Sequence, residues 1–199
     1  MSENVLEVKN LCKYFDVNRG MKGAQKVIAV DGISFEVKKG ETFGLVGESG
    51  CGKSTLGRTV LRIYEPTKGE IVFEGEDISR RTVASLAGQV GYVFQNPDDQ
   101  IFKYKVTDEV MFGPLNIGMP KEKAMEKAME ALALTELTPY AGENPYDLEL
   151  SQRKLVAIAS VLAMDTDVII LDEPTIAQDY RGKEIIRNII CLLYTSPSP

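Results

Sequence analysis

The stretch Gly47-Glu48-Ser49-Gly50-Cys51-Gly52-Lys53-Ser54-Thr55 matches the pattern G-x-x-x-x-G-K-[ST] and decides which fold the chain must build. It follows an apolar run at 42–46, which we expect to be a strand, and it precedes a segment from Lys53 to about Ile63, which we expect to be a helix. Glycines let backbone N–H groups converge on an anion without a Cβ in the way. The strand–loop–helix order therefore predicts a phosphate-binding loop made by this whole stretch.

Three residues of this loop are candidates for specific roles toward a bound nucleoside triphosphate. Lys53 is expected to reach the β- and γ-phosphates and to act in catalysis, and Ser54 is expected to hold Mg²⁺. Thr55 would add a further phosphate contact, in the favourable field of the helix N-terminus. The alternative is an incidental glycine-rich turn.

A second site is indicated where the apolar run Val168–Leu171 ends in two adjacent acids, Asp172 and Glu173. A buried strand that ends in carboxylates is costly unless a cation is nearby. Mg²⁺ is the natural cation in a chain with a phosphate loop, so we expect Asp172 to coordinate it through water. Glu173 would polarise the attacking water as the catalytic base. The alternative is a surface turn with solvated acids.

Apolar patterns elsewhere indicate mixed α and β structure. Alternating or continuous apolar residues predict further strands at 6–8, 33–37, 71–73 and 90–94. Apolar residues at helical spacing predict helices at 120–134 and 155–164. The first of these helices should bury one face, made of Ala124, Met125, Ala128, Met129, Ala131 and Leu132.

The composition excludes several classes of protein. The chain has no histidine, which removes Ser-His-Asp catalysis and histidine metal sites. A net charge of −6 argues against a nucleic-acid partner, because nucleic-acid-binding domains are basic. Cys12, Cys51 and Cys191 are too scattered for a disulfide framework or a zinc site. The most apolar segment, 155–164, is much shorter than the about 20 residues of a membrane span, so we expect a cytoplasmic protein that reaches a membrane only through a partner.

The two sites and the segment between them resemble the ATP-binding subunit of ABC transporters, over residues 3 to about 190. The stretch Val93-Phe94-Gln95-Asn96-Pro97 resembles the Q-loop of that family. This resemblance implies that Gln95 contacts Mg²⁺ or the attacking water and communicates with a membrane partner.

Two further positions are similar to family motifs. Phe15 resembles the aromatic residue that stacks on adenine, the alternative being a core aromatic. Asp179 matches the last residue of the D-loop.

The resemblance implies an α/β fold, a P-loop NTPase with a RecA-like parallel sheet core, an antiparallel β subdomain and a helical insert subdomain. The ABC-type domain would cover residues 1–190, with the helical subdomain at about 98–160. ATP and Mg²⁺ are the implied cofactors. The implied partners are a second ABC ATPase subunit, identical or different, and a transmembrane permease or coupling subunit. The chain would then lie at the cytoplasmic face of the cell membrane as a peripheral protein.

The signature motif of the family, L-S-G-G-Q, is altered in this chain. Without gaps it corresponds to Leu148-Glu149-Leu150-Ser151-Gln152, where only the outer residues agree; an alternative register keeps Leu150-Ser151 and deletes both glycines. In the family's ATP-bound dimer this motif contacts the γ-phosphate held by the partner's loop. A carboxylate repels phosphate and a Cβ blocks close approach, so we expect a sound phosphate loop but a poor contribution to the opposite site.

The C-terminal segment 191–199 does not look native, since it resembles the translation of a transposon-type sequencing adapter. The alternative is a Pro/Ser-rich disordered terminus. The family's switch histidine lies beyond the D-loop and is not reached, so we expect slow ATP hydrolysis or none. Residues 3 to about 80 resemble oligopeptide and dipeptide importer ATPases, and those from about Thr82 resemble energy-coupling-factor ATPases. A joined sequence and a single natural subfamily both fit this pattern.

The leading hypothesis is an ATP-binding and ATP-hydrolysing subunit of an ABC importer that powers uptake of a peptide, vitamin or metal ion through a membrane partner. Two alternatives stay open. One is a soluble P-loop NTPase outside transport, such as a nucleotide kinase. The other is a degenerate ABC subunit that binds ATP with little or no turnover.

Overall fold

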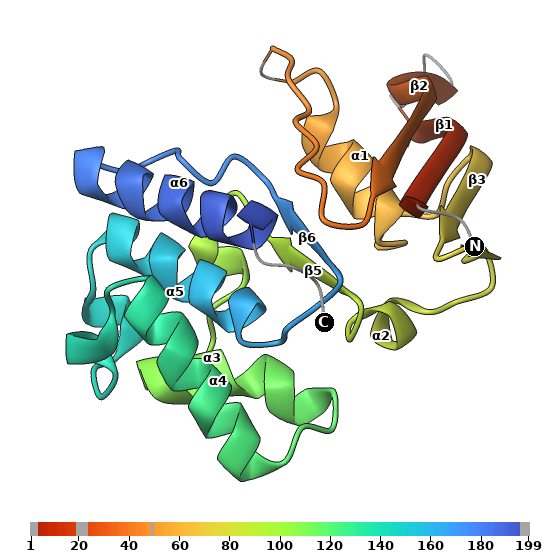
Figure 1. The fold of residues 1–199 in the computed structure, drawn as a ribbon. Coiled ribbons are helices and arrows are strands. Elements are labelled where there is room, and N and C mark those ends of the chain that lie inside the picture. The colour runs from red at the N-terminus through yellow and green to blue at the C-terminus, as the bar shows by residue number, and fades with distance from the viewer. Residues whose placement is uncertain (1–3, 19–23, 49, 196–199) are drawn as a thin grey trace. The chain divides into compact units, whose positions relative to one another are not determined.

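The computed structural model describes residues 4–18, 24–48 and 50–195, which form two compact units divided between Leu86 and Ala87. Unit 1 is the N-terminal one and unit 2 the C-terminal one, and each is described by itself. Figure 1 labels their elements.

Unit 1 contains a four-stranded antiparallel sheet in the order β2-β1-β3-β4. Leu6 pairs with Phe73 of β3, and Val8 pairs with Phe35 of β2. The strands predicted at 6–8, 33–37 and 71–73 are confirmed, because alternating apolar residues suit a sheet with one buried face. The strands are β1 Asn4–Asn18, β2 Ala24–Lys38, β3 Lys68–Phe73 and β4 Glu76–Asp77.

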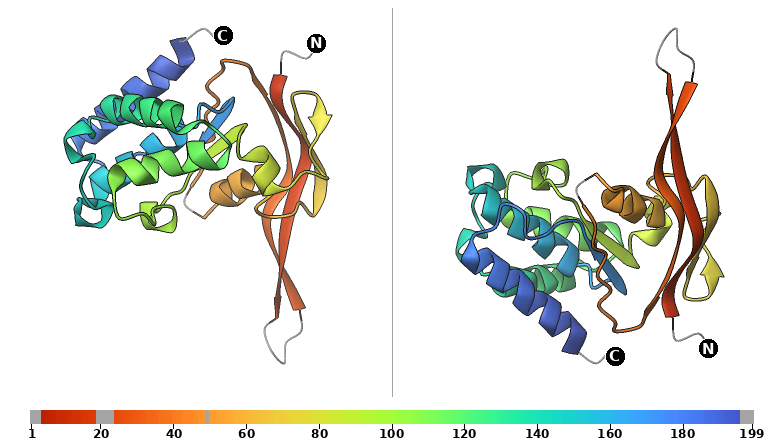
Figure 2. Two further views of the ribbon diagram at one scale, coloured as in Figure 1. Left: turned by 90° about the horizontal axis from the view of Figure 1, so that it is seen from below. Right: turned by 90° about the horizontal axis from the view of Figure 1, so that it is seen from above.

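Helix α1, Lys53–Val60, lies against the β1–β2 hairpin (Figure 2) and buries Leu56 and Val60. The helix ends at Val60, before Ile63, which was its predicted end. Arg62 adopts a positive φ of 59°, its N–H donates to the Thr59 carbonyl, and the Ile63 N–H donates to the Arg58 carbonyl. This Schellman motif ends the helix, although it is usually built on glycine.

The strand expected at 42–46 is not formed, and this prediction is wrong for the structure. Residues 41–48 have no regular secondary structure, and the side chains of Phe43, Leu45 and Val46 are exposed. A strand of a parallel sheet needs a parallel neighbour to accept its backbone hydrogen bonds. The described strands of unit 1 are all antiparallel, so unit 1 by itself offers no such neighbour.

Unit 2 is built around a parallel pair of strands, β5 Val90–Val93 and β6 Val168–Leu171, which lie side by side in Figure 1. Val90 pairs with Val168, and Val93 pairs with Leu171. Both predicted strands are confirmed. Parallel pairing requires a long crossover between the strands, and here the crossover holds most of the helices.

The helices predicted at 120–134 and 155–164 are confirmed as α4 Lys121–Leu134 and α5 Leu150–Leu162.

Helix α6, Tyr180–Thr195, continues through 191–195. These residues are the first part of the segment that the sequence indicated as a non-native tail, and 196–199 lie outside the described residues. No helix in the described part of the chain is long and apolar enough to cross a membrane. The helices are α2 Val83–Leu86 in unit 1, and α3 Val106–Asn116, α4 Lys121–Leu134, α5 Leu150–Leu162 and α6 Tyr180–Thr195 in unit 2, with short 3₁₀ turns η2 Pro97–Asp99, η3 Thr138–Tyr140 and η4 Pro145–Asp147.

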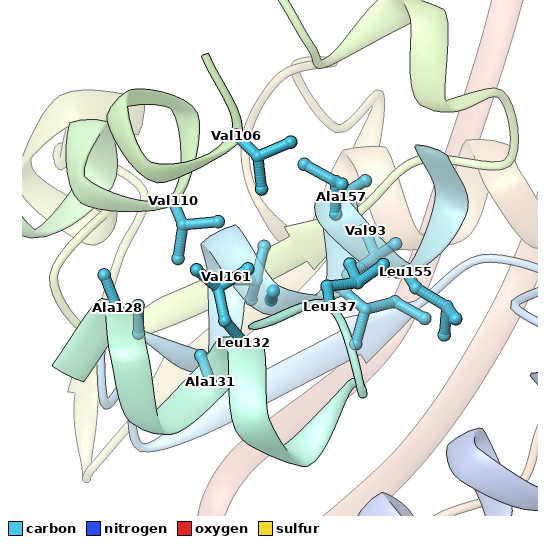
Figure 3. Packing of buried hydrophobic residues seen from close by; sticks show 14 of the residues in the cluster. Val93, Val106, Val110, Ala128, Ala131, Leu132, Leu137, Leu155, Ala157 and Val161 are labelled. Carbon is cyan, nitrogen blue, oxygen red and sulfur yellow. The ribbon is translucent and has the colours of Figure 1, made fainter. Parts of the chain in front are cut away.

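The core of unit 2 forms where α3, α4 and α5 pack together around β5 (Figure 3). From α4, four of the predicted residues are buried: Ala124, Ala128, Ala131 and Leu132. Met125 and Met129 are 40% and 39% exposed, so their prediction as core residues was wrong. Each methionine follows a buried alanine. Because successive residues are rotated by about 100° around the helix axis, both methionines lie at the edge of the buried stripe.

Truncation of Leu132 tests the packing of this core. The side chain is fully buried, so Leu132→Ala is expected to lower the free energy of unfolding by about 2–5 kcal/mol. Leu134→Ala on the same helix is the matched control, because Leu134 is 42% exposed, and it should change stability little. Urea denaturation followed by circular dichroism measures both. Equal losses in the two variants would contradict the packing described here.

Candidate functional site

In unit 1, the lysine of the phosphate loop is hydrogen-bonded to the backbone of the loop itself. Lys53 is the first residue of α1, and its Nζ donates hydrogen bonds to the carbonyls of Gly47 and Glu48, the latter at 3.2 Å. The Cys51 N–H donates to the Glu48 carbonyl at 3.3 Å, which makes the turn within the loop. The ammonium group is thereby held over the loop, where a phosphate would bind.

Two glycines are required by the shape of this loop. Gly52 has a φ of 92°, and a Cβ there would meet the Ala29 carbonyl oxygen at 2.0 Å. A Cβ on Gly47 would meet the Cys51 Sγ at 2.5 Å. Both positions therefore keep the backbone open, as a close approach to an anion requires.

The N-terminus of α1 suits an anion. No side chain among the described residues caps this helix, and its first turn holds no acid. The first backbone N–H groups of a helix lack intrahelical partners and carry partial positive charge. Ser54 and Thr55 follow Lys53 in this turn, so the described loop residues fit a phosphate group; Ser49 lies outside the described residues.

Phe15, the candidate adenine-stacking residue, lies on β1 and is half-buried. Its ring meets Tyr64 edge-on at 5.4 Å, and the Lys13 Nζ lies 4.9 Å from its centroid. The aromatic ring therefore has packing partners within unit 1, and its role toward adenine stays a prediction.

In unit 2 the structure brings together the predicted catalytic glutamine and glutamate. Gln95 follows the end of β5, and Glu173 follows the end of β6. The Gln95 Nε2 donates to the Glu173 Oε2 at 2.7 Å, although the residues are 78 positions apart in the sequence. The parallel register causes this meeting, since it places the carboxyl ends of both strands at one edge of the sheet.

The neighbouring acid, Asp172, is 7% exposed and accepts a hydrogen bond from the Tyr92 hydroxyl at 2.9 Å. Glu173 has a φ of 48°, in the left-handed region that non-glycine residues seldom adopt. Strained backbone of this kind gathers at functional sites, where the surroundings hold it in place.

Each unit offers oxygen groups of the kinds that Mg²⁺ prefers. In unit 2 these are the carboxylate of Asp172 and the amide oxygen of Gln95, and in unit 1 the hydroxyl of Ser54. Within the described ranges, no cluster of three or more His, Cys, Asp or Glu residues could hold a metal ion.

Sequence reasoning missed Lys154, which is 1% exposed on α5 and donates from Nζ to the carbonyls of Phe94 and Gln95. Burial lowers the pKa of its ammonium group, while the charges of Asp172 and Glu173 act in the opposite direction. A signal was available in the sequence: Lys154 lies on the same helical face as the buried Ala157, Ile158 and Val161, where a lysine is unusual.

The signature-like stretch forms the N-terminus of α5. The Glu149 N–H donates to the Gln152 Oε1 at 3.1 Å, and the Glu149 carboxylate faces the Gln152 N–H, the arrangement of a capping box. Leu148 is buried and Leu150 is 43% exposed. The capping box thus engages the N–H groups of Glu149 and Gln152 at the start of this helix.

The D-loop candidate, Asp179, acts as the N-cap of α6, because its Oδ1 accepts a hydrogen bond from the Gly182 N–H at 2.7 Å. The preceding residue, Gln178, is buried and donates from Nε2 to the Ser151 carbonyl at 2.9 Å. Gln178 was also missed, because a lone polar residue in a loop gives no sequence signal of its partner.

Comparison with known proteins shows the family of the chain. The sequence profile of the family described as "ABC transporter" matches residues 30–176. The oligopeptide transport ATP-binding protein AppF of Bacillus subtilis is 40% identical over 197 residues, which cover 94% of this chain and 60% of AppF. The energy-coupling factor transporter ATP-binding protein EcfA of Methanocaldococcus jannaschii is 44% identical over 161 residues, covering 80% of this chain and 58% of EcfA. The chain spans between 25% and 65% of the length of such curated relatives.

Solved structures give the same result. CbiO1 from Clostridium perfringens, part of the ABC transporter complex cbiONQ, is 33% identical with a TM-score of 0.77, over 96% of this chain and 74% of that chain. The ATP-binding cassette MJ0796, a dimer bound to ADP and Pi, is 26% identical with a TM-score of 0.85, over 96% and 83%. The P-loop NTPase fold with antiparallel and helical parts is thereby confirmed, and the chain belongs to the ABC transporter family as an ATP-binding domain.

Proposed function

We propose that the chain is the ATP-binding and ATP-hydrolysing subunit of an ABC importer. The observation that carries this proposal is the hydrogen bond between Gln95 and Glu173, because it joins a candidate base to an amide that can orient water. A carboxylate can accept a proton from water, and an amide neighbour holds it in a defined orientation.

The other residues of the two halves complete this assignment. The phosphate loop binds the triphosphate through its N–H groups and Lys53, and Phe15 stacks on the adenine. Candidate ligands for Mg²⁺ are the Ser54 hydroxyl, the Gln95 amide oxygen and Asp172. The bound ion would neutralise charge on the β- and γ-phosphates. Glu173 then accepts the proton of the attacking water.

The transport role is supported by the names of the relatives, which include an oligopeptide and an energy-coupling-factor ATPase. We propose that the domain covers residues 1–190, with a helical subdomain at about 98–160, and that it works at the cytoplasmic face of the membrane. Its partners would be a second ABC ATPase subunit and a transmembrane permease or coupling subunit. The solute class stays open between peptides and vitamins or metal ions.

One observation favours a second candidate, a degenerate subunit that binds ATP with little turnover. The capping box of Glu149 and Gln152 engages the N-terminus of α5, where the resemblance to the family implies contact with a partner's γ-phosphate. Such a subunit would bind ATP at its own loop with little or no turnover. It would support poor hydrolysis at the partner's loop.

Lys53→Ala tests the phosphate loop. Loss of one charge-assisted hydrogen bond, worth about 1.5–3 kcal/mol, should weaken ATP binding about 10- to 150-fold. Lys26→Ala on β2 is the matched control, since Lys26 is an exposed lysine of the same unit. Isothermal titration calorimetry with Mg·ATP measures both affinities. Unchanged binding by Lys53→Ala would remove the basis of the proposal.

Glu173→Gln tests the assignment of the base. Removal of a general base should lower the turnover number on the order of 10²-fold or more, whereas ATP affinity should stay close to that of the unmodified chain. Single-turnover ATPase assays with the chain alone, and mixed with an intact homologous subunit, give both quantities. Asp165→Asn serves as control, because Asp165 precedes β6 and pairs with Lys127, whereas Glu173 follows the carboxyl end of that strand. Full activity of Glu173→Gln would show that another group is the base.

The altered signature is tested by the double substitution Glu149→Ser, Leu150→Gly. It removes the carboxylate and one Cβ, and it should raise hydrolysis by a mixture in which only the partner's loop is competent. To obtain such a mixture, Lys53→Ala is added to this chain, with and without the double substitution, and each form is mixed with an intact homologous subunit. Glu143→Ser, in the loop before η4, controls for the loss of one negative charge. No gain from the double substitution would indicate that the signature is not what limits the partner's site.

A further inference from the structure

Lys154 holds a position that packing alone does not explain. It lies in the first half of α5 on a face otherwise made of apolar side chains, and it is 1% exposed. Transfer of an ammonium group into such surroundings is unfavourable unless hydrogen bonds compensate. A side chain of similar length without charge would fill the same volume at lower cost.

The partners of Lys154 are two consecutive backbone carbonyls. Its Nζ donates to the Phe94 oxygen at 2.9 Å and to the Gln95 oxygen at 2.5 Å. These carbonyls lie directly after Val93, where β5 ends, so they are the first backbone groups beyond the strand. A single lysine therefore joins α5 to the backbone that carries the Gln95 side chain.

A second side chain ties the same backbone to the same helix. The Gln100 Oε1 accepts from the Phe94 N–H at 3.2 Å, and its Nε2 donates to the Ala157 carbonyl at 2.9 Å and to the Ser160 Oγ at 3.1 Å. Lys154 and Gln100 together thus hold the N–H and the carbonyl of Phe94. The position of Gln95 is consequently defined by α5 as well as by β5.

We propose that Lys154 is a positioning residue, which fixes the backbone of Gln95 so that the Gln95 amide meets Glu173. The effect on hydrolysis rests on the proposed function, whereas the effect on the backbone does not. Gln95 is exposed, and its amide reaches Glu173 at 2.7 Å, so a displaced backbone carbonyl would move the amide out of hydrogen-bond range. Through this lysine, the helix that begins at the signature-like stretch determines the geometry of the catalytic pair.

The variant Lys154→Met keeps the length and the apolar stem and removes the donors. Hydrogen exchange of the full chain, followed by mass spectrometry, should then show faster exchange in the peptide 94–101, by about tenfold, with little change in α4. Lys127→Met is the control, because Lys127 is a partly buried lysine of the same unit that pairs with Asp165 at 3.0 Å instead of with the backbone after β5. Lys154→Arg retains donors and should stay close to the unmodified chain. Unchanged exchange at 94–101 in Lys154→Met would overturn the proposal.

ATP hydrolysis distinguishes positioning from general stabilisation. In a mixture with an intact homologous subunit, Lys154→Met should lower the turnover number at least tenfold and leave KM for ATP unchanged. In a Gln95→Ala background Lys154→Met should have no further effect on the turnover number, because the amide that Lys154 positions is absent. Equal losses in both backgrounds would overturn the proposal, as would faster exchange throughout unit 2.

Two further outcomes are informative. Absence of hydrolysis by the unmodified chain in every mixture would refute the proposed function, while the exchange experiment would still decide the positioning role. If Lys154→Met does not fold, Gln100→Met provides a second test. It removes the other side chain that bonds to Phe94, and it leaves the buried Lys154 in place. It should raise exchange at the Phe94 amide, and protection equal to that of the unmodified chain would overturn the proposal.

Discussion

The parallel pairing of β5 with β6 is the constraint on which the candidate catalytic pair of unit 2 depends. It places the ends of both strands at one edge, so that Gln95 and Glu173 meet at 2.7 Å across a long sequence separation. Without this register the two side chains would have no reason to be close, because a shift of pairing moves every side chain that follows. The strained φ of Glu173 shows that the backbone turns sharply just where the carboxylate is needed.

Helix α5 connects the other parts of unit 2 to this pair. At its beginning, the Ser151 carbonyl accepts a hydrogen bond from Gln178, next to the residue that caps α6. One turn further, Lys154 reaches the backbone of Gln95. The altered signature, the loop before α6 and the glutamine after β5 are therefore joined through one helix by specific hydrogen bonds, so displacement of that helix would affect all three.

Much of the fold and of the candidate site could be predicted from local patterns. The phosphate loop and the two acids were recognised because each lies in a short contiguous stretch with its own chemistry, and Gln95 was recognised from its resemblance to the Q-loop of the family. Lys154 was missed, because its role depends on carbonyls about 60 residues away. The strand expected at 42–46 was wrong for a related reason: an apolar run shows that a segment suits a strand, but a strand exists only beside a partner.

By itself, the sequence determined which chemistry is possible. It holds a glycine-rich loop with a lysine and a hydroxyl, a strand that ends in two acids, and no histidine to support other mechanisms. Only the tertiary structure decided which groups meet: Gln95 with Glu173, Tyr92 with Asp172, and the buried Lys154 with the backbone after β5. The physical reason is that composition and periodicity act over a few residues, whereas strand register and helix packing bring together groups that are distant along the chain.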